Sequence, residues 1–236
     1  MYINNKILIL CLKGNYYYEN FYKYIISNTK FKYDVFLIDN FDVNKKLYYL
    51  KNFGVNNIIN LFYNYIGNFF SSNLKDICKK RNIDIISVSD QKDLRKKIKK
   101  KYLVAFASVD FILKKKILNH SKFGFLNFHC ADINKYRGRN CLFWTMLKKN
   151  KFVSFTIHKM NEKFDNGNII SLKKFKSKKK YFDNLKLLFV EGQKDAVNIL
   201  KKKKFKNIGK KPKIGKYYHK PLKSDIEFFK LMGLKF

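Results

Sequence analysis

Residues Phe123–Ile170 read FGFLNFHCADINKYRGRNCLFWTMLKKNKFVSFTIHKMNEKFDNGNII, and this stretch decides the fold. It opens with an apolar strand that ends on two polar side chains, Asn127 and His129. The elements expected after this first strand, Gly124–His129, are a helix, a strand, a turn and a strand: Leu142–Lys149, Phe152–Met160, Asp165–Asn168 and Ile169–Phe175. The stretch therefore predicts strands of a sheet whose ends carry polar residues.

Upstream of this stretch, apolar runs of strand length alternate with amphipathic helical stretches. The expected strands are Lys6–Leu12, Asp34–Ile38, Asn56–Phe62, Ile83–Val88 and Tyr102–Ala107. The expected helices are Tyr16–Asn28, Leu74–Arg81, Leu94–Lys101 and Phe111–Leu118. Such alternation predicts an α/β fold, a Rossmann-like and mostly parallel sheet with helices on both faces.

Downstream, the chain is expected to end in a short α/β tail. We predict a catalytic domain over residues 1–178 and a tail over 179–236 that contains a helix at Tyr181–Lys202, a short strand and a last helix. Ser224 and Glu227 have the spacing of a capping box at the start of that last helix, and Gly233 is placed to end it.

The net charge of +35 would draw this chain of 236 residues toward phosphate polymers. However, 48 of its 52 basic residues are lysines, whereas phosphate recognition favours the planar fork of arginine. Lys, Asn, Ile, Phe and Tyr dominate the composition, which is typical of an AT-rich genome. We interpret most lysines as solvated surface, and a basic nucleic-acid-binding protein stays open as an alternative.

The cysteines and the hydropathy indicate a cytoplasmic protein. Cys11, Cys78, Cys130 and Cys141 are far apart and form no CxxC pair, so neither a disulfide nor a metal site is expected. The apolar runs stay below the roughly 18 residues of a membrane span, and we expect no membrane association. Cys130 lies beside His129 and is weighed as a nucleophile, but free cysteines are more often small buried hydrophobes.

Asn127 and His129 are separated by one residue, so the period of two in a strand directs both side chains to one face. Ligands of open α/β sheets bind beyond the carboxyl ends of the strands. There an amide can stabilise negative charge on a carbonyl oxygen, and an imidazole can carry protons. The alternative is a strand end with a turn-forming Asn and a half-buried His.

Four motifs in sequence order resemble the folate-dependent formyltransferase family. They are an Asn-x-His strand end, an aromatic-Arg-Gly step, a strand with Thr-x-His and an Asp-x-Gly-x-Ile-Ile turn, present here as Asn127–His129, Tyr136–Gly138, Thr156–His158 and Asp165–Ile170. Upstream, Leu103–Leu113 is similar to the strand and loop that hold the pterin ring in the family. Three positions depart from the family pattern, since Cys130, Asn134 and Ser154 replace two prolines and a glycine.

The resemblance implies a formyltransferase fold and formyl transfer from 10-formyltetrahydrofolate to an amine, with no metal. It implies Asn127, His129 and Asp165 as catalytic residues, with Asp165 orienting the imidazole. It implies folate contacts at Asp110, Phe111, Ile112, Leu113, Asn127, Asn161, Glu162 and Asp165 and substrate contacts at Tyr136, Arg137 and Gly138. His158 is expected to be a structural or substrate-edge residue rather than a second base.

The acceptor amine is less well determined. About 60 residues follow Phe175, fewer than the family's tRNA-modifying members need for their added barrel domain, and the tail is similar to those of stand-alone sugar N-formyltransferases. We therefore expect a nucleotide-linked amino sugar as the acceptor. Methionyl-tRNA stays open as an acceptor, and so does a homodimeric assembly.

Overall fold

A computed structural model describes residues 6–39 and 74–236 of the chain. In the described residues one sheet has seven strands, in the order β3-β2-β1-β4-β5-β7-β8. These strands are β1 (Lys6–Leu12), β2 (Lys32–Ile38), β3 (Ile85–Val88), β4 (Val104–Ser108), β5 (Phe125–His129), β7 (Phe152–Lys159) and β8 (Ile169–Lys176). The pairs from β3 through β5 are parallel, and β7 and β8 are antiparallel to their neighbours. The predicted mostly parallel α/β sheet is confirmed.

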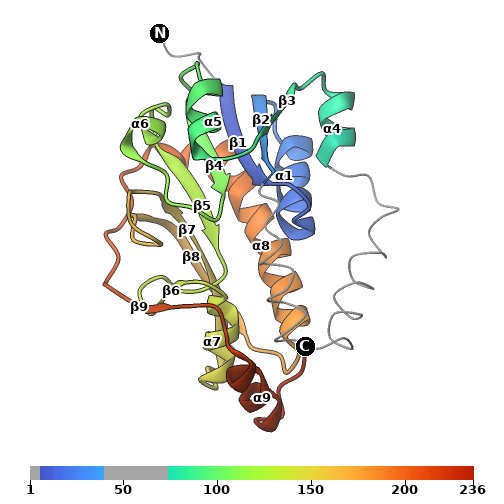
Figure 1. Ribbon diagram of the computed structural model, residues 1–236, viewed down its shortest axis with the longest axis vertical. Coiled ribbons are helices and arrows are strands. Elements are labelled where there is room, and N and C mark those ends of the chain that lie inside the picture. The colour runs from blue at the N-terminus through green and yellow to red at the C-terminus, as the bar shows by residue number, and fades with distance from the viewer. Residues whose placement is uncertain (1–5, 40–73) are drawn as a thin grey trace.

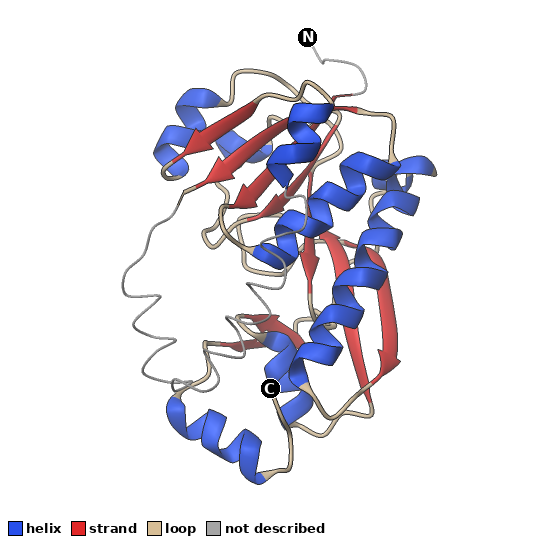
Figure 2. Cartoon of the chain, turned by 90° about the vertical axis from the view of Figure 1, so that its right-hand side faces the viewer, coloured by secondary structure: helices blue, strands red, loops and turns tan. Residues whose placement is uncertain are grey.

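Helices cover both faces of this sheet (Figures 1 and 2). The helices are α1 (Tyr16–Asn28), α4 (Leu74–Lys80), α5 (Gln91–Lys97), α6 (Lys115–Leu118), α7 (Cys141–Leu147), α8 (Tyr181–Lys201) and α9 (Lys223–Leu231), with a 3₁₀ turn at Lys204–Lys206. Side chains of α1, α4, α7 and α8 share one hydrophobic core with one face of the sheet, and those of α5 and α6 share a second core with the other face. None of the helices in the described ranges is long and apolar enough to cross a bilayer.

The central strand β1 shows why the sheet is covered on both sides. Its sequence KILILCL is apolar at six successive positions, of which the first five are fully buried. Ile7 and Ile9 belong to one core and Leu8 and Leu10 to the other, because side chains alternate across a strand. A continuous apolar run is what a parallel strand between two helical layers requires.

The tail packs onto the sheet and the loops beside it. Helix α8 lies along the sheet next to α1 (Figure 1), with Leu188 and Ile199 fully buried in the same core. A second, two-stranded sheet joins β6 (Tyr136–Gly138) to β9 (Lys216–Tyr218) of the tail. The tail is thus connected to the loop that follows the Asn-x-His strand end.

Several expected boundaries differ from the observed ones. The last helix begins before Ser224, because its first turn is capped by Asp225, whose Oδ2 accepts from the backbone N–H of Leu222 at 2.8 Å. The helices expected at Leu94–Lys101 and Phe111–Leu118 are α5 and the single turn α6, and the strand expected at Ile83–Val88 starts at Ile85. The strand expected at Asn56–Phe62 lies outside the described residues.

Helix α8 approaches β5 closely at Gly192. A Cβ atom placed there would lie 2.1 Å from Cε2 of Phe128, whose ring is buried between Phe21, Phe155 and Phe189. Only a residue without a side chain allows this contact. The helix therefore supports the strand that carries Asn127 and His129.

We expect Gly192→Ala to lower the free energy of unfolding by about 1–3 kcal/mol, because overpacking a filled core forces the Phe128 ring to move. This loss outweighs the helix propensity that alanine adds, about 1 kcal/mol. Urea unfolding measures it, and Lys186→Ala at an exposed position of the same helix is the control, expected within about 0.5 kcal/mol of the parent. Equal or greater stability of the Gly192 variant would contradict the packing.

Candidate active site

A cavity of about 230 Å³ opens at the carboxyl ends of β1, β4 and β5. In chain order the sheet grows from β1 outward to β3 and then returns to β4, so β1 and β4 meet at a topological switch point. Leu12 ends β1 and Ser108 ends β4, and both line the cavity. Crevices at such switch points are the usual ligand sites of α/β sheets.

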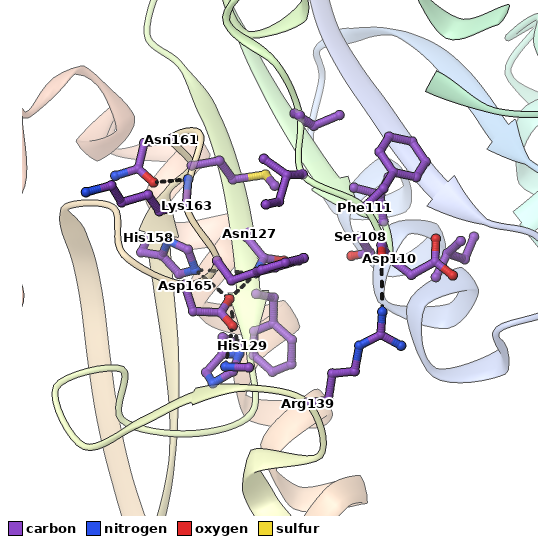
Figure 3. Close-up of a pocket in the computed structure, with 18 of the residues that line it drawn as sticks. Ser108, Asp110, Phe111, Asn127, His129, Arg139, His158, Asn161, Lys163 and Asp165 are labelled. Atoms are coloured by element: carbon purple, nitrogen blue, oxygen red, sulfur yellow. Dashed lines mark hydrogen bonds and ion pairs between the residues drawn. The ribbon is translucent and has the colours of Figure 1, made fainter. Parts of the chain in front are cut away.

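One wall of the cavity is a polar cluster around the Asp165 carboxylate (Figure 3). Oδ1 of Asp165 lies 3.4 Å from Nδ1 of His129 and 3.5 Å from Nε2 of His158, and it accepts from Nδ2 of Asn127 at 3.3 Å. Oδ2 accepts from the backbone N–H of Gly138 at 2.9 Å. The structure therefore brings Asn127, His129 and Asp165 together and adds His158 to them.

The turn that carries Asp165 is tightly constrained. Asp165 has a φ of +44°, in the left-handed region that aspartate tolerates better than most residues. At Gly167, two positions later, a Cβ atom would lie 1.4 Å from the carbonyl oxygen of Lys159, so only glycine fits. The Asp-x-Gly pattern thus reflects a turn that packs directly against β7.

The hydrogen bonds of His129 indicate which ring nitrogen carries the proton. Nε2 lies 3.1 Å from the carbonyl oxygen of Tyr136, to which only a protonated nitrogen can donate. In the neutral ring Nδ1 is then the unprotonated nitrogen, and it faces Asp165. His129 is positioned to accept a proton at Nδ1 and to share the resulting charge with a carboxylate.

Burial and charge act in opposite directions on these groups. Burial lowers the pKa of His129 below its ordinary 6.5, although the Asp165 carboxylate partly offsets this. Burial by itself raises the pKa of Asp165, but the His129 and His158 imidazoles and the Gly138 N–H outweigh it and hold the pKa well below its ordinary value. Asp165 is therefore ionised near neutrality, and His129 is mostly neutral.

The amide of Asn127 is held by two partners. Besides Asp165, its Nδ2 donates at 3.3 Å to Nε2 of His158, whose other ring nitrogen donates to the Lys159 carbonyl at 3.0 Å. These bonds fix the tautomer of His158 with its proton on Nδ1. His158 is 2% exposed and orients Asn127, as expected of a structural residue.

The opposite side of the cavity comes from the end of β4 and the loop after it, where Figure 3 shows Ser108, Asp110 and Phe111. Met160, in the loop after β7, also lines the cavity. Gln91 holds the loop after β4, since its Nε2 donates to the Ile112 carbonyl at 2.9 Å and its Oε1 accepts from the Lys114 N–H at 3.2 Å. Asp110, Phe111, Ile112, Leu113 and Asn161 of the expected folate contacts line the cavity. Glu162 does not, because its Oε1 accepts from the Lys115 N–H at 3.0 Å outside it.

Two of the three expected substrate residues lie elsewhere. Tyr136 is 7% exposed and its hydroxyl accepts from Asn150, while Arg137 has a buried Nε with no partner among the described residues. Neither lines the cavity. Gly138 does, and Arg139 lines it in place of Arg137, with Nη2 3.5 Å from the Asp110 carbonyl.

Arg139, Lys163 and Lys220 also line the cavity, although no sequence motif predicts a role for them. These lysines are hard to find among 48, because nothing in their local sequence marks them. The sequence does contain a pattern that indicates a role for His158. Polar residues occupy alternate positions of the apolar strand β7, at Ser154, Thr156 and His158, and all three are buried. Cys130 is not activated, because burial raises the pKa of its thiol.

Comparisons with known proteins find similarity to formyltransferases. The family model described as formyl transferase matches residues 72–182. Methionyl-tRNA formyltransferase of Prochlorococcus marinus (strain AS9601) is 38% identical over 65 residues, which are 28% of this chain and only 20% of that protein.

Solved structures share the fold along nearly the whole chain. An N-formyltransferase from Helicobacter canadensis, in complex with folinic acid and dTDP-3-aminofucose, has a TM-score of 0.63 at 16% identity, covering 92% of this chain and 71% of that one. A 4-N formyltransferase from Francisella tularensis has a TM-score of 0.59 at 19% identity, covering 91% and 76%.

We expect the pKa of His129, followed by NMR of its labelled imidazole, to lie below 6.5 and to fall further in Asp165→Asn. The Asp165 carboxylate is the neighbour that most raises the pKa of His129, whereas burial lowers it. Removing the carboxylate therefore lets burial lower the pKa further. Asp183→Asn, an exposed first-turn residue of α8, is the control and should leave the pKa unchanged. A midpoint above 6.5 in the parent chain, or a rise in the Asp165 variant, would refute the assigned environment.

Proposed function

We propose that this chain, which carries a formyl transferase domain over residues 72–182, transfers a formyl group from 10-formyltetrahydrofolate to a primary amine. The observation that carries the proposal is the buried cluster of Asn127, His129 and Asp165 on one wall of the cavity. A protein that only binds nucleic acid has no need of an ionised carboxylate buried against two imidazoles. The cluster therefore favours the enzyme over the basic binding protein.

His129 acts as the proton carrier. As the amine nitrogen bonds to the formyl carbon, Nδ1 of His129 takes the proton that the amine loses, and Asp165 stabilises the imidazolium. The bond from the formyl carbon to the folate nitrogen then breaks, and the same proton returns to that nitrogen. Atoms and charge balance without a metal ion or an oxidant.

Asn127 supports the charge that collects on the formyl oxygen. Both contacts of its Nδ2 are long, 3.3 Å, so an anionic oxygen at the site can replace one of them as the stronger acceptor. The second contact, to His158 or Asp165, keeps the amide in place during the exchange. Preorganised donors of this kind are typically a large part of catalysis by acyl-transfer enzymes.

The donor's pterin ring fits the side of the cavity formed by residues 108–113 and 160. Phe111, Ile112, Leu113 and Met160 supply apolar surface, and the backbone between them, fixed by Gln91, supplies amide and carbonyl groups. A flat heteroaromatic ring with polar edges needs this combination. We propose these residues, with Asp110 and Asn161, as the folate contacts.

The acceptor is a nucleotide-linked amino sugar. Arg139, Lys163 and Lys220 come from three different segments and bring three cations to one small cavity. An acceptor with phosphate groups would complement them, and a planar guanidinium binds phosphate through two parallel hydrogen bonds. The structural neighbour with bound dTDP-3-aminofucose supports this choice, whereas the relative named for methionyl-tRNA keeps tRNA as the alternative.

His129→Ala and Asp165→Asn should each lower kcat at least about 10²-fold, the scale of lost acid-base catalysis. The double variant should fall well short of the product of the two losses, because the residues act as a unit. Folinic acid, a stable analogue of the donor, should bind both variants nearly as well as the parent in a titration. His120→Ala, which removes an imidazole outside the cavity, is the control; near-normal turnover of Asp165→Asn would reduce that residue to a turn former.

Release of tetrahydrofolate, assayed with a panel of acceptors, should be fast with an amino-sugar nucleotide and much slower with the same sugar lacking its nucleotide. Arg139→Gln should raise the KM of that acceptor about 10-fold, the worth of one charge-assisted hydrogen bond, and change kcat little. Arg95→Gln, on the exposed face of α5, is the matched control. If methionyl-tRNA were the one acceptor of the panel that supported turnover, the acceptor would be tRNA and not an amino-sugar nucleotide.

A further inference from the structure

The strand β6 presents its two backbone edges to different parts of the molecule. The Tyr136 carbonyl accepts from Nε2 of His129 at 3.1 Å, and the Gly138 N–H donates to Oδ2 of Asp165 at 2.9 Å. Backbone groups of residues two apart in a strand point to the same side. One edge of β6 therefore orients both titratable groups of the proposed mechanism.

The other edge of β6 is bound by the tail. The N–H of Arg139 donates to the Tyr218 carbonyl at 2.8 Å, and the N–H of Lys216 donates to the Lys135 carbonyl at 3.1 Å. These partners belong to β9, which runs parallel to β6 with Gly138 opposite Tyr218. The backbone of β6 is thus held between the catalytic cluster and a strand that lies 80 positions later in the chain.

The fit between the two strands is close. A Cβ atom at Gly138, whose φ is +97°, would lie 2.3 Å from the Tyr218 carbonyl oxygen. Gly215 approaches the same loop, since its Cβ would lie 2.6 Å from the Ile133 carbonyl oxygen. A residue without a side chain is therefore required at position 138 for β9 to pair with β6. Proximity to His129 and Asp165 alone would not require a glycine there.

Tyr218 fastens β9 in this position. Its ring is 8% exposed and lies between two others, 5.4 Å from the ring of Tyr136 and 5.3 Å from that of Trp144. Nε1 of Trp144 in turn donates to the carbonyl of His219 at 3.0 Å. Aromatic pairs of this geometry stabilise by about 0.5–1.5 kcal/mol beyond their buried area.

We propose that Tyr218 is a positioning residue of the active site, which acts by holding β9 against β6 so that the β6 backbone fixes His129 and Asp165. The tail is then part of the catalytic apparatus through β9, although no residue of β9 itself lines the cavity. This inference rests on the proposed function for its kinetic consequence, but its structural consequence does not depend on any activity.

The experiment compares Tyr218→Ala with Tyr218→Phe, which keeps the ring. Hydrogen–deuterium exchange of residues 136–140 should accelerate in the alanine variant and stay at the parental rate in the phenylalanine variant. With the amine acceptor, kcat of the alanine variant should fall about 10-fold or more, because a displacement of about 1 Å at a reacting group can cost up to about 10²-fold. The affinity for folinic acid should change little, since no residue of β9 lines the cavity and Gln91 holds the loop on the proposed pterin side. The phenylalanine variant should keep the parental kcat.

Controls separate this role from general stability. Leu231→Ala, at an 83% exposed position of α9, should match the parent chain in exchange and in kcat. Tyr218→Leu keeps more buried volume than alanine and is used if the alanine variant does not fold. Unchanged exchange at residues 136–140 overturns the proposal whether or not the protein transfers formyl groups, and faster exchange with parental kcat overturns the positioning role. Absence of turnover with every acceptor in the parent chain refutes the proposed function instead.

Discussion

The site depends on the burial of one ionised carboxylate. Asp165 sits 10% exposed in a turn with left-handed backbone, and its two oxygens contact Asn127, His129, His158 and the Gly138 amide. A buried charge is costly unless neighbouring groups compensate it. Here the amides of Asn127 and Gly138 donate to the carboxylate, and the two imidazoles help to hold its pKa low. Four separate segments of the chain therefore meet at this carboxylate.

The register of the sheet itself brings several of these side chains together. Because β5 and β7 are antiparallel, Asn127 lies directly opposite His158, and the amide and the imidazole meet without any loop. The turn between β7 and β8 then returns Asp165 to the same end. Across the cavity the loop after β4 is apolar and fixed by Gln91. A reactive polar wall thus faces an apolar wall, which is how a site can hold a flat ring and still move protons.

Much of this was predictable from local pattern. Alternating strands and helices predicted the sheet, and the period of two placed Asn127 and His129 on one side of a strand end. The part played by His158 depends on the register of two antiparallel strands, which the sequence does not specify. The choice between Arg137 and Arg139 depends on where the three-residue strand β6 ends, because Arg139 lies just after it and lines the cavity whereas Arg137 lies within it and does not. The pairing of β6 with β9 leaves no local signal, because three residues suffice for each strand and the partners are far apart in the chain.

The pairing of β6 with β9 affects the order in which the protein folds during its synthesis. Chains are synthesised at about 5–20 residues per second, so β9 leaves the ribosome on the order of several seconds after β6. During that interval His129 and Asp165 are already present, but one edge of the strand that orients them has no partner. The contact is also non-local, joining strands 80 positions apart, and non-local contacts are slow to form in folding. The backbone that orients the reactive cluster is therefore paired on both edges only after β9 has been synthesised, later than every strand of the seven-stranded sheet.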